Sequence, residues 1–345
     1  MTTKQIVLRE LRKGGVVSGE ALAATAHVSR AAVWKAVSSL RRDGYAIDAS
    51  TKTGYFLSIE KSIVNKSSIE DYLLRYYPAS HISVLVYNSI DSTNNELKRL
   101  SASNADLHKT VAIALEQTAG RGRLGRSFFS SSQTGVFMSL LYSPKAGVTD
   151  PAKMTANAAI AVCRAISRLY GVEAQIKWVN DVFLGEKKLC GILTEGVSNL
   201  ETGRIDSAIV GIGINIACPA SSDGVPDEVK QIASFLQDYT DSKTVDRNLV
   251  IATVLGELVS IYDKIESGDE AEAQKCLAEY RSRSLLTGKR IRVYPVIAEE
   301  ESSYFAKVVG VSDDLSLIVE SDDGKRLELK SGEVTLKSTS IATGA

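Results

Sequence analysis

Residues Gln117–Arg126 read Q-T-A-G-R-G-R-L-G-R, so that three arginines alternate with three glycines directly after a strand-like run. Neither a helix nor a strand has this alternation. Glycine lets the main chain come close to a ligand, and the planar guanidinium suits carboxylate and phosphate oxygens. We expect a mobile cationic loop that closes over an anionic small molecule. A solvated basic loop, or a nucleic-acid patch of the Arg/Gly kind, is the alternative.

Polar side chains also follow the strand predicted at Ser83–Ile90. Ser92, Thr93 and Asn94 stand where that strand gives way to a helix at Asn95–Leu100. Such residues commonly cap a helix. They could instead hydrogen-bond a neutral polar ligand, and the spacing alone favours the cap.

Two further apolar runs, Gln175–Leu184 and Lys188–Gly196, are predicted to be strands joined by a short turn through Gly185. A lysine at the head of a buried strand is costly unless an anion meets it, so Lys188 is a candidate anion ligand. The alternative is that Lys188 points to solvent at the strand end. The other polar residues that interrupt these runs are Lys177, Asn180 and Asp181.

A third glycine-containing strand, Asp206–Ile216, includes V-G-I-G-I-N-I but lacks the third glycine of a dinucleotide-binding fingerprint. The phosphate-binding sequence G-x-x-x-x-G-K-[ST] does not occur in the chain. A nucleotide would therefore have to bind on a different scaffold.

The composition of the 345 residues is that of an ordinary globular protein with formal net charge zero. The four cysteines are scattered without a C-x-x-C pair, and the three histidines stand apart from them, which argues against a zinc site or a disulfide framework. The first ten residues are polar, and no apolar run reaches membrane-spanning length. We expect a soluble cytoplasmic protein with two or three domains.

Residues 1–60 have the pattern of a winged helix-turn-helix. Helices are predicted at Lys4–Arg12, Gly19–Ala26 and Arg30–Asp43, with a stop at Gly44 and a hairpin at Tyr45–Leu57 whose turn lies near Thr53. The same residues hold nine Lys and Arg against five Asp and Glu, a net charge of +4. This surplus favours DNA binding over a protein-interaction domain. The candidate DNA-binding residues are Ser29, Arg30, Ala31, Lys35, Arg41 and Arg42.

The remaining elements predict a central α/β part and a C-terminal β part. Strands at Thr110–Gln117 and Gly135–Tyr142 and helices at Pro151–Tyr170, Asp246–Glu266 and Glu270–Ser284 belong to the first. Short alternating strands follow at Arg290–Val296, Tyr304–Val311, Leu315–Glu320, Arg326–Leu329 and Glu333–Leu336. Their pattern is typical of a small SH3-like β-barrel.

Taken together, these motifs resemble the biotin–protein ligase family, in the bifunctional bacterial form that is both ligase and biotin-operon repressor. The resemblance rests on Thr93-Asn94, on Gln117–Arg126, on K-W-V-N-D from Lys177, on K-L-C-G-I-L from Lys188 and on G-I-G-I-N from Gly211, in that order. The chain departs from the family at three positions, where proline, tryptophan and alanine are usual: Val179, Phe128 and Cys190.

The resemblance implies an α+β fold with a class II synthetase-like mixed sheet, divided into a winged helix-turn-helix at residues 1–60, a linker at 61–68, a ligase domain at 69–285 and an SH3-like barrel at 286–345. It implies an ATP-dependent ligase that converts biotin to biotinyl-5′-AMP and transfers biotin to a lysine of a biotin carboxyl carrier protein or another biotin-dependent carboxylase. A lipoate-type ligase and a non-catalytic ligand-sensing repressor are the alternatives.

Site residues follow from the same resemblance. Lys188, Arg123 and Arg121 would be catalytic, and Asp181 would contribute to a Mg²⁺ site. Biotin would contact Ser92, Thr93, Asn94, Gln117, Gly120, Arg121, Gly122, Arg123, Lys188 and Gly191. ATP would contact Arg123, Arg126, Phe128, Lys177, Asn180 and Asn215. Biotinyl-5′-AMP would also be the corepressor that makes a homodimer bind operator DNA.

Overall fold

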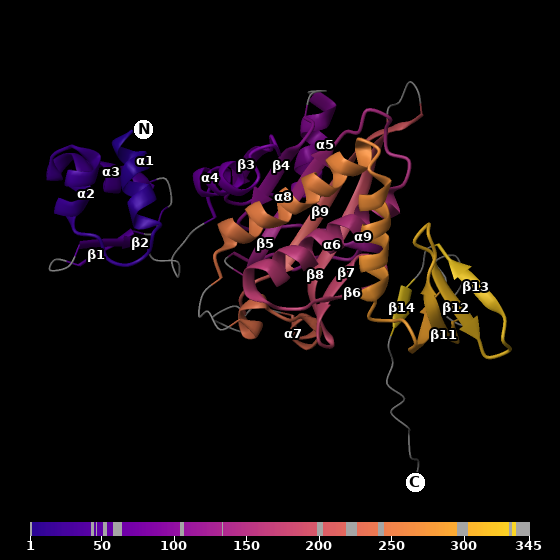
Figure 1. The fold of residues 1–345 in the computed structure, drawn as a ribbon. Coiled ribbons are helices and arrows are strands. Elements are labelled where there is room, and N and C mark those ends of the chain that lie inside the picture. The colour runs from indigo at the N-terminus through magenta and orange to yellow at the C-terminus, as the bar shows by residue number, and fades with distance from the viewer. Residues whose placement is uncertain are drawn as a thin grey trace, which may run out of the picture.

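Three parts follow one another along the chain in the computed structural model (Figure 1). The structure describes residues 2–42, 45, 47–50, 54–57, 64–103, 107–132, 134–198, 203–218, 226–240, 245–294, 303–330 and 333–335. A small helical part with a hairpin comes first, a sheet covered by helices forms the middle, and an antiparallel sheet follows. The order of these parts is the order expected from the sequence.

The N-terminal part has the predicted three helices and hairpin. They are α1 (Thr3–Leu11), α2 (Gly19–Ala26), α3 (Arg30–Arg42), β1 (Ile47–Ser50) and β2 (Gly54–Leu57). The side chain of Ser18 caps α2, as predicted, by accepting a hydrogen bond from the Ala21 amide. Val7, Val37 and Leu40 are fully buried between the helices. The predicted helix stop at residue 44 and the turn residue at 53 lie outside the described residues.

A helix that was not predicted from the sequence connects the N-terminal part to the middle part. Helix α4 (Lys66–Tyr76) begins inside the segment assigned to the linker, of which residues 61–63 are not described. Asn65 caps it by accepting a hydrogen bond from the Ser68 amide at 2.9 Å. The helix buries Ile69 and packs against the long helix α8 (Arg247–Glu266). Tertiary packing, more than local sequence, therefore stabilises it.

The middle part is a seven-stranded mixed sheet in the order β3-β4-β5-β9-β8-β7-β6. Strand β3 runs parallel to β4, and the other neighbours are antiparallel, which confirms the predicted mixed sheet. The strands are β3 (Ser83–Tyr87), β4 (Thr110–Ala114), β5 (Gly135–Tyr142), β6 (Gln175–Lys177), β7 (Asp181–Leu184), β8 (Lys187–Ser198) and β9 (Ile205–Asn215).

The prediction of one continuous strand at Gln175–Leu184 was wrong. The chain turns back after β6, so that Ile176 pairs with Val182 in an antiparallel hairpin. Backbone groups of the turn have partners outside this ladder. Asn180 exchanges hydrogen bonds with the Ile192 backbone, and Tyr280 donates to the Val179 carbonyl at 3.1 Å. These long-range bonds satisfy backbone polar groups that would have paired with a neighbouring strand if the segment were one straight strand.

Helices cover both faces of this sheet (Figure 1). Helices α6 (Pro151–Tyr170), α8 (Arg247–Glu266) and α9 (Glu270–Ser282) pack on one face. Helix α5 (Thr93–Ser103) lies on the opposite face, where Leu97 packs with Ala112 and Ile209. The short helix α7 (Asp227–Ile232) was not predicted. The face that carries α5 is therefore the one left partly open.

The C-terminal part is a five-stranded antiparallel sheet in the order β13-β12-β11-β10-β14. Its strands are β10 (Arg290–Tyr294), β11 (Tyr304–Val311), β12 (Leu317–Ser321), β13 (Arg326–Leu329) and β14 (Glu333–Thr335). The predicted strand residues at 295, 296 and 336 lie outside the described ones. The buried Trp178 of the β6–β7 turn donates its indole N–H to the Leu315 carbonyl at 2.7 Å. This bond ties the sheet to the middle part.

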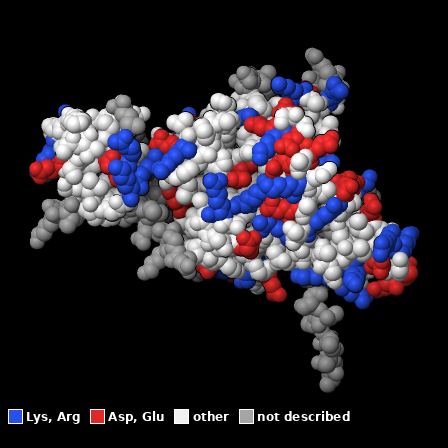
Figure 2. Space-filling view, viewed as in Figure 1, with Lys and Arg blue, Asp and Glu red and all other residues white. Residues whose placement is uncertain are grey.

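Charged side chains of both signs are mixed over the visible face of the molecule (Figure 2). This distribution agrees with the zero formal net charge, and many of the charges form ion pairs such as Arg283 with Glu173 and Glu279. Among the helices that the structure describes, none has both the length and the apolar character needed to cross a bilayer.

The packing of α4 against α8 predicts a large difference between two substitutions on the same helix. Ile69 is fully buried and Leu74 is 71% exposed. We expect Ile69→Ala to lower the free energy of unfolding by about 2–5 kcal/mol and Leu74→Ala to change it by less than about 0.5 kcal/mol. Urea denaturation in a Trp34→Phe background, followed by the fluorescence of Trp178, measures both. Equal midpoints would show that α4 does not contribute to the core.

Candidate functional site

Strand β9 presents a bare face to the side of the sheet that carries α5. Side chains alternate along a strand, so Val210, Ile212 and Ile214 are buried under the opposite helices while Gly211, Gly213 and Asn215 face the other way. A methyl group added to Gly211 would lie 2.3 Å from the Asn94 side-chain oxygen. The motif V-G-I-G-I-N-I therefore specifies a strand with one buried face and one face that side chains from other elements can approach closely.

An aromatic ring occupies part of this bare face. Gly213 of β9 pairs with Gly191 of β8, and the ring of Phe128 lies over both. A Cβ atom at Gly213 would come within 2.6 Å of that ring. Phe128 also packs edge-on against Phe137 of β5, with 6.3 Å between ring centroids.

A small cavity of about 50 Å³ opens beside this ring, and we call it the amide-lined cavity. The Gln117 side chain is fixed in the wall of this cavity. Its side-chain oxygen accepts hydrogen bonds from the backbone amide and the hydroxyl of Thr93 at 2.9 and 3.1 Å, and its NH₂ donates to the Ser130 hydroxyl. The cavity is lined by Ser92, Thr93, Asn94, Gln117, Arg121, Gly122, Arg123, Phe128, Met138, Asn180, Lys188, Gly191, Ile192, Leu193, Gly211, Ile212 and Gly213.

Asn94 is held by hydrogen bonds at both ends of its side chain. Its oxygen accepts from the fully buried Ser139 hydroxyl at 2.5 Å, and its NH₂ donates to Glu195 at 2.8 Å. Glu195 also pairs with Lys98 at 2.7 Å and with Arg121 at 3.1 Å. Burial by itself raises the pKa of Glu195, but the hydrogen bonds from Lys98 and Asn94 outweigh it and leave that pKa below its ordinary value.

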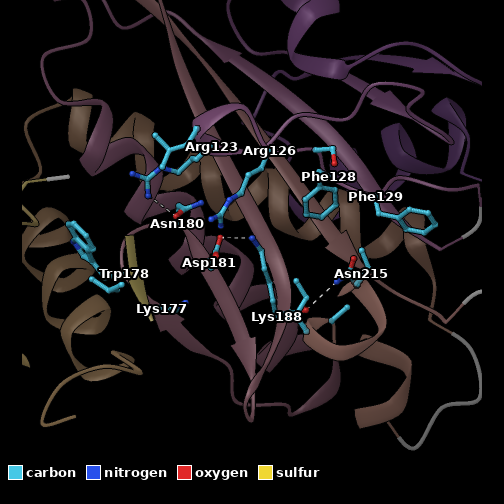
Figure 3. Close-up of a pocket in the computed structure, with 17 residues that line it drawn as sticks. Arg123, Arg126, Phe128, Phe129, Lys177, Trp178, Asn180, Asp181, Lys188 and Asn215 are labelled. Carbon is cyan, nitrogen blue, oxygen red and sulfur yellow. Dashed lines mark hydrogen bonds and ion pairs between the residues drawn. The ribbon is translucent and has the colours of Figure 1, made fainter. Parts of the chain in front are cut away.

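A second cavity of about 280 Å³, the cationic cavity, adjoins the first (Figure 3). Four of its lining side chains are Arg or Lys and one is Asp. This imbalance attracts an anionic ligand. Its lining residues are Gly122, Arg123, Leu124, Arg126, Ser127, Phe128, Phe129, Lys177, Trp178, Asn180, Asp181, Lys188, Asn215, Val229, Ile232, Ala233 and Val334.

Lys188 and Asp181 form an ion pair in the wall of the cationic cavity. The Lys188 ammonium lies 2.8 Å from Oδ1 of Asp181 (Figure 3). The backbone of Lys188 is fixed, because its carbonyl accepts from the amide of Ser234 and from the side chain of Asn215. The Lys188 charge therefore faces the cavity on a rigid strand.

The Arg/Gly loop forms the roof of both cavities. It is closed by a 2.7 Å hydrogen bond from the Gly122 amide to the Arg126 carbonyl. Arg123 donates to Oδ1 of Asn180 at 3.0 Å, and Arg121 donates to Asn95 at 3.0 Å. The loop is thus attached to α5, to β8 and to the β6–β7 turn.

A third, outer cavity of about 570 Å³ lies on the far side of this loop. It is bounded by the start of α6, by Ile192–Glu195 at the edge of β8 and by Asp314–Ser316 of the C-terminal part. Gly122, Arg123 and Asn180 line all three cavities. The hydrogen-bonded pair Arg123–Asn180 therefore stands where the three meet.

The structure brings together nearly all residues that were assigned to the biotin and ATP sites. Every one of them lines the amide-lined or the cationic cavity except Gly120. Gly120 lies at the base of the loop, where its carbonyl accepts from the Phe128 amide at 2.9 Å. Asp181, assigned to a metal, lines the cationic cavity next to Lys188.

Several site residues were missed from the sequence. Ser139 and Glu195 hold Asn94, and Gly211 and Gly213 leave room for it and for Phe128. The period-two alternation of V-G-I-G-I-N-I was the available signal for the glycines. Nothing local marks Ser139 or Glu195, because their partners come from distant elements.

The candidate DNA-binding residues lie apart, at the start and end of α3. Arg30, Ala31, Lys35 and Arg42 are exposed, and the Ser29 hydroxyl accepts a hydrogen bond from the Ala32 amide at 3.2 Å as a helix cap. Arg41 donates from Nε to the Ile47 carbonyl at 2.8 Å. Arg41 thus also fastens α3 to the hairpin.

Comparison with known proteins gives two matching family models. The model described as the biotin/lipoate A/B protein ligase family matches residues 86–215, which include the whole Arg/Gly loop and strands β4 to β9. The model described as an HTH domain matches residues 3–56, and it confirms the predicted helix-turn-helix.

Similar proteins cover nearly the whole chain. The bifunctional ligase/repressor BirA of Bacillus subtilis is 32% identical over 309 residues, 89% of this chain and 90% of the relative. The protein of the same name from Escherichia coli is 29% identical over 330 residues, 95% of each. A solved structure of biotin protein ligase from Aquifex aeolicus in complex with biotin and ATP has a TM-score of 0.60 and 28% identity, and covers 74% of this chain and 98% of that one.

The environment of Glu195 predicts a pH-dependent stability. Because the pKa of Glu195 lies below its usual 4.5, the ionised form stabilises the fold above about pH 4.5, and this stabilisation is lost as the pH falls through the lowered pKa. The thermal midpoint of Glu195→Gln should therefore lie below that of the wild type at pH 7, with the gap closing below pH 4.5. Glu186→Gln, in the exposed β7–β8 turn, is the matched control. A gap that stays constant with pH would contradict the assigned contacts.

Proposed function

We propose the activity from one premise: the chain belongs to the biotin/lipoate A/B protein ligase family, and its relatives within it are bifunctional ligase/repressors. The protein is an ATP-dependent biotin–protein ligase and a biotin-responsive repressor. The observation that carries the ligase assignment is the junction of the amide-lined and cationic cavities at Arg123 and Lys188. A pocket walled by amide and hydroxyl side chains and an anion-binding pocket share these two cations.

In the first step a biotin carboxylate oxygen attacks the α-phosphorus of ATP. A P–O bond forms, the bond from that phosphorus to the bridging oxygen breaks, and pyrophosphate leaves with its electron pair. Both reactants are anionic, so fixed positive charge must stand where they meet. Lys188 and Arg123 would neutralise the carboxylate and the α-phosphate, with Arg121 on the outer side of the loop.

Biotin would lie in the amide-lined cavity. Asn94, Thr93, Gln117 and Ser92 would hydrogen-bond the neutral ureido ring, above the bare face made by Gly191 and its partner on β9. The ring of Phe128 lies against Gly191 and Gly213 and occupies part of this face. The Phe128 ring would therefore move away from the glycines when biotin enters.

ATP would lie in the cationic cavity. Arg126 and Lys177 would contact phosphates, and Phe128 and Asn215 would contact the adenine. Mg²⁺ commonly binds through one or two carboxylates together with substrate phosphates. Asp181 is the carboxylate that lines this cavity, and its partner Lys188 would turn to the ligand anions, so Asp181 would hold the ion, which would neutralise phosphate charge when bound.

The second step would take place from the outer cavity. A lysine amine of the acceptor, a biotin carboxyl carrier protein or another biotin-dependent carboxylase, attacks the mixed anhydride carbonyl. An amide bond forms, AMP leaves, and the amine loses a proton. The support is positional: Arg123 and Asn180 line both the outer cavity and the cavity proposed for ATP. Closure of the loop would keep water from the anhydride.

The repressor role would use the same ligand as a switch. Biotinyl-5′-AMP would act as corepressor, and two chains would join before α3 of each reads operator DNA. On β8, Thr194–Ser198 pair with β9 on one side, and no described strand pairs with their other edge. We infer that this edge joins two chains and also receives the acceptor. The reaction would take place in the cytoplasm.

The domain division would follow the expected limits: residues 1–60 for DNA binding, 61–68 as a linker that runs into α4, 69–285 for ligation and 286–345 as an SH3-like barrel. The order and antiparallel pairing of the five C-terminal strands support the last of these. The class II synthetase-like description of the central sheet is supported by its mixed strand order.

Substitution of Lys188 tests the ligase assignment. Biotin-dependent exchange of pyrophosphate into ATP should fall by about 10²–10³-fold in Lys188→Ala, the loss expected for one stabilising charge. Lys187→Ala, at the adjacent exposed position, is the matched control and should keep wild-type exchange. Undiminished exchange in Lys188→Ala would remove that lysine from the site.

The same assay distinguishes the alternatives. Exchange that requires lipoate in place of biotin would identify a lipoate-type ligase. Biotin binding with no exchange, and no labelling of an acceptor lysine in the presence of ATP, would identify a ligand sensor without catalysis.

A shared β8 edge predicts competition between the two functions. Excess unbiotinylated acceptor, added to protein with biotin and ATP, should weaken binding to operator DNA, because the acceptor occupies the edge needed for dimerisation. Biotinylated acceptor is the control and should compete less. Operator binding that is indifferent to both would show that the two partners use different surfaces.

A further inference from the structure

An exposed tryptophan stands on the second turn of α3. Trp34 is 59% exposed, whereas Trp178, the other tryptophan of the chain, is 5% exposed. Large aromatic side chains usually bury most of their surface in a folded domain. Trp34 is therefore available to a partner, and it lies outside the set of residues that the sequence marked for DNA binding.

The position of Trp34 on the helix places it among cations. Residues three and four apart are neighbours on a helix surface, so Arg30 and Ala31 lie one turn before Trp34, and Lys35 lies one turn after Ala31. All four are exposed, while the opposite face of α3 is buried in the core of the N-terminal part through Val33, Ala36, Val37 and Leu40. The exposed stripe thus combines a flat apolar surface with two positive charges.

The charge of this stripe points to a polyanion. Helix α3 contains no acidic residue, and residues 1–60 carry a net charge of +4 in a chain whose total is zero. The match of residues 3–56 to an HTH domain makes α3 the helix that enters the major groove. Cations on such a helix can bind phosphates, but the neutral indole of Trp34 cannot form an ion pair with them.

We propose that Trp34, with Ala31 beside it, is the apolar base-reading element of α3 and contacts thymine methyl groups in the major groove. Apolar side chains recognise the thymine C5-methyl group there, while Arg30 and Lys35 fix the register through phosphates. This assignment rests on the proposed repressor function. It makes Trp34 a specificity determinant, and the neighbouring cations determinants of affinity.

The test uses the full chain with biotin and ATP, and a duplex that this protein selects from a random-sequence pool. Trp34→Ala should weaken binding to the selected duplex by about 5–150-fold, the range for losing recognition of one base pair in a specific site. Replacing thymine by uracil in that duplex removes only the methyl groups. It should weaken wild-type binding at one or two positions and have a smaller effect on Trp34→Ala, which retains only Ala31 as an apolar contact.

Salt dependence separates the indole from its neighbours. The slope of log affinity against log salt should be unchanged in Trp34→Ala and should fall by about 1 in Lys35→Ala, because only the lysine neutralises a phosphate. Trp34→Phe retains an apolar ring and should lie between wild type and alanine. Leu74→Ala, an exposed apolar truncation on α4, is the matched control and should bind like the wild type.

Quenching of Trp34 fluorescence by acrylamide, taken as the difference between wild type and Trp34→Phe, should be suppressed by the selected duplex. Equal binding of the thymine and uracil duplexes by wild type, with no loss in Trp34→Ala, would overturn the proposal while leaving the repressor function intact. Protection of Trp34 by biotin and ATP without DNA would show a protein interface instead. A failure to select any duplex would reject the repressor function and, with it, this role.

Discussion

The site depends on a steric constraint in two neighbouring strands. Gly211 and Gly213 of β9, with Gly191 of β8, leave the sheet without side chains over the area where Asn94 and Phe128 approach the backbone. A single added methyl group at Gly211 would meet the Asn94 oxygen at 2.3 Å. Ile212, between the two glycines of β9, is buried in the same core cluster as residues of α6 and α8, so the same strand supplies both the core and the floor of the site. The amide-lined cavity exists because this face is bare.

The site carries an excess of positive charge, although the formal net charge of the whole chain is zero. Each cation at the cavity junction already has a protein oxygen as a partner: Lys188 has Asp181, Arg123 has Asn180, and Arg121 has Glu195. Burying a cation alone is costly, and a partner reduces that cost. A ligand carboxylate or phosphate can replace these partners, so that the cations are ready for an anion before it arrives.

Local patterns in the sequence predicted much of this arrangement. Helical spacing located α1 to α3, α6, α8 and α9, and the alternation of glycine with arginine marked the loop that roofs the cavities. The elements that were not predicted are held by residues distant in the sequence. The turn at Trp178–Asn180 is held by Ile192, Tyr280 and Leu315, and α4 is held by α8, so neither could be predicted from neighbouring residues. Glu195 could not be predicted as a site residue for the same reason, because its partner Asn94 is distant in the sequence.

The most direct measurement of the central claim is a crystal structure of the full chain with a non-hydrolysable biotinyl-adenylate analogue. The account predicts the ureido ring beside Asn94, the adenine beside Asn215, and the linkage between them within about 3 Å of the Lys188 ammonium, which would have left Asp181. The analogue bound elsewhere, or Lys188 still paired with Asp181 and the linkage out of reach of Arg123, would contradict it.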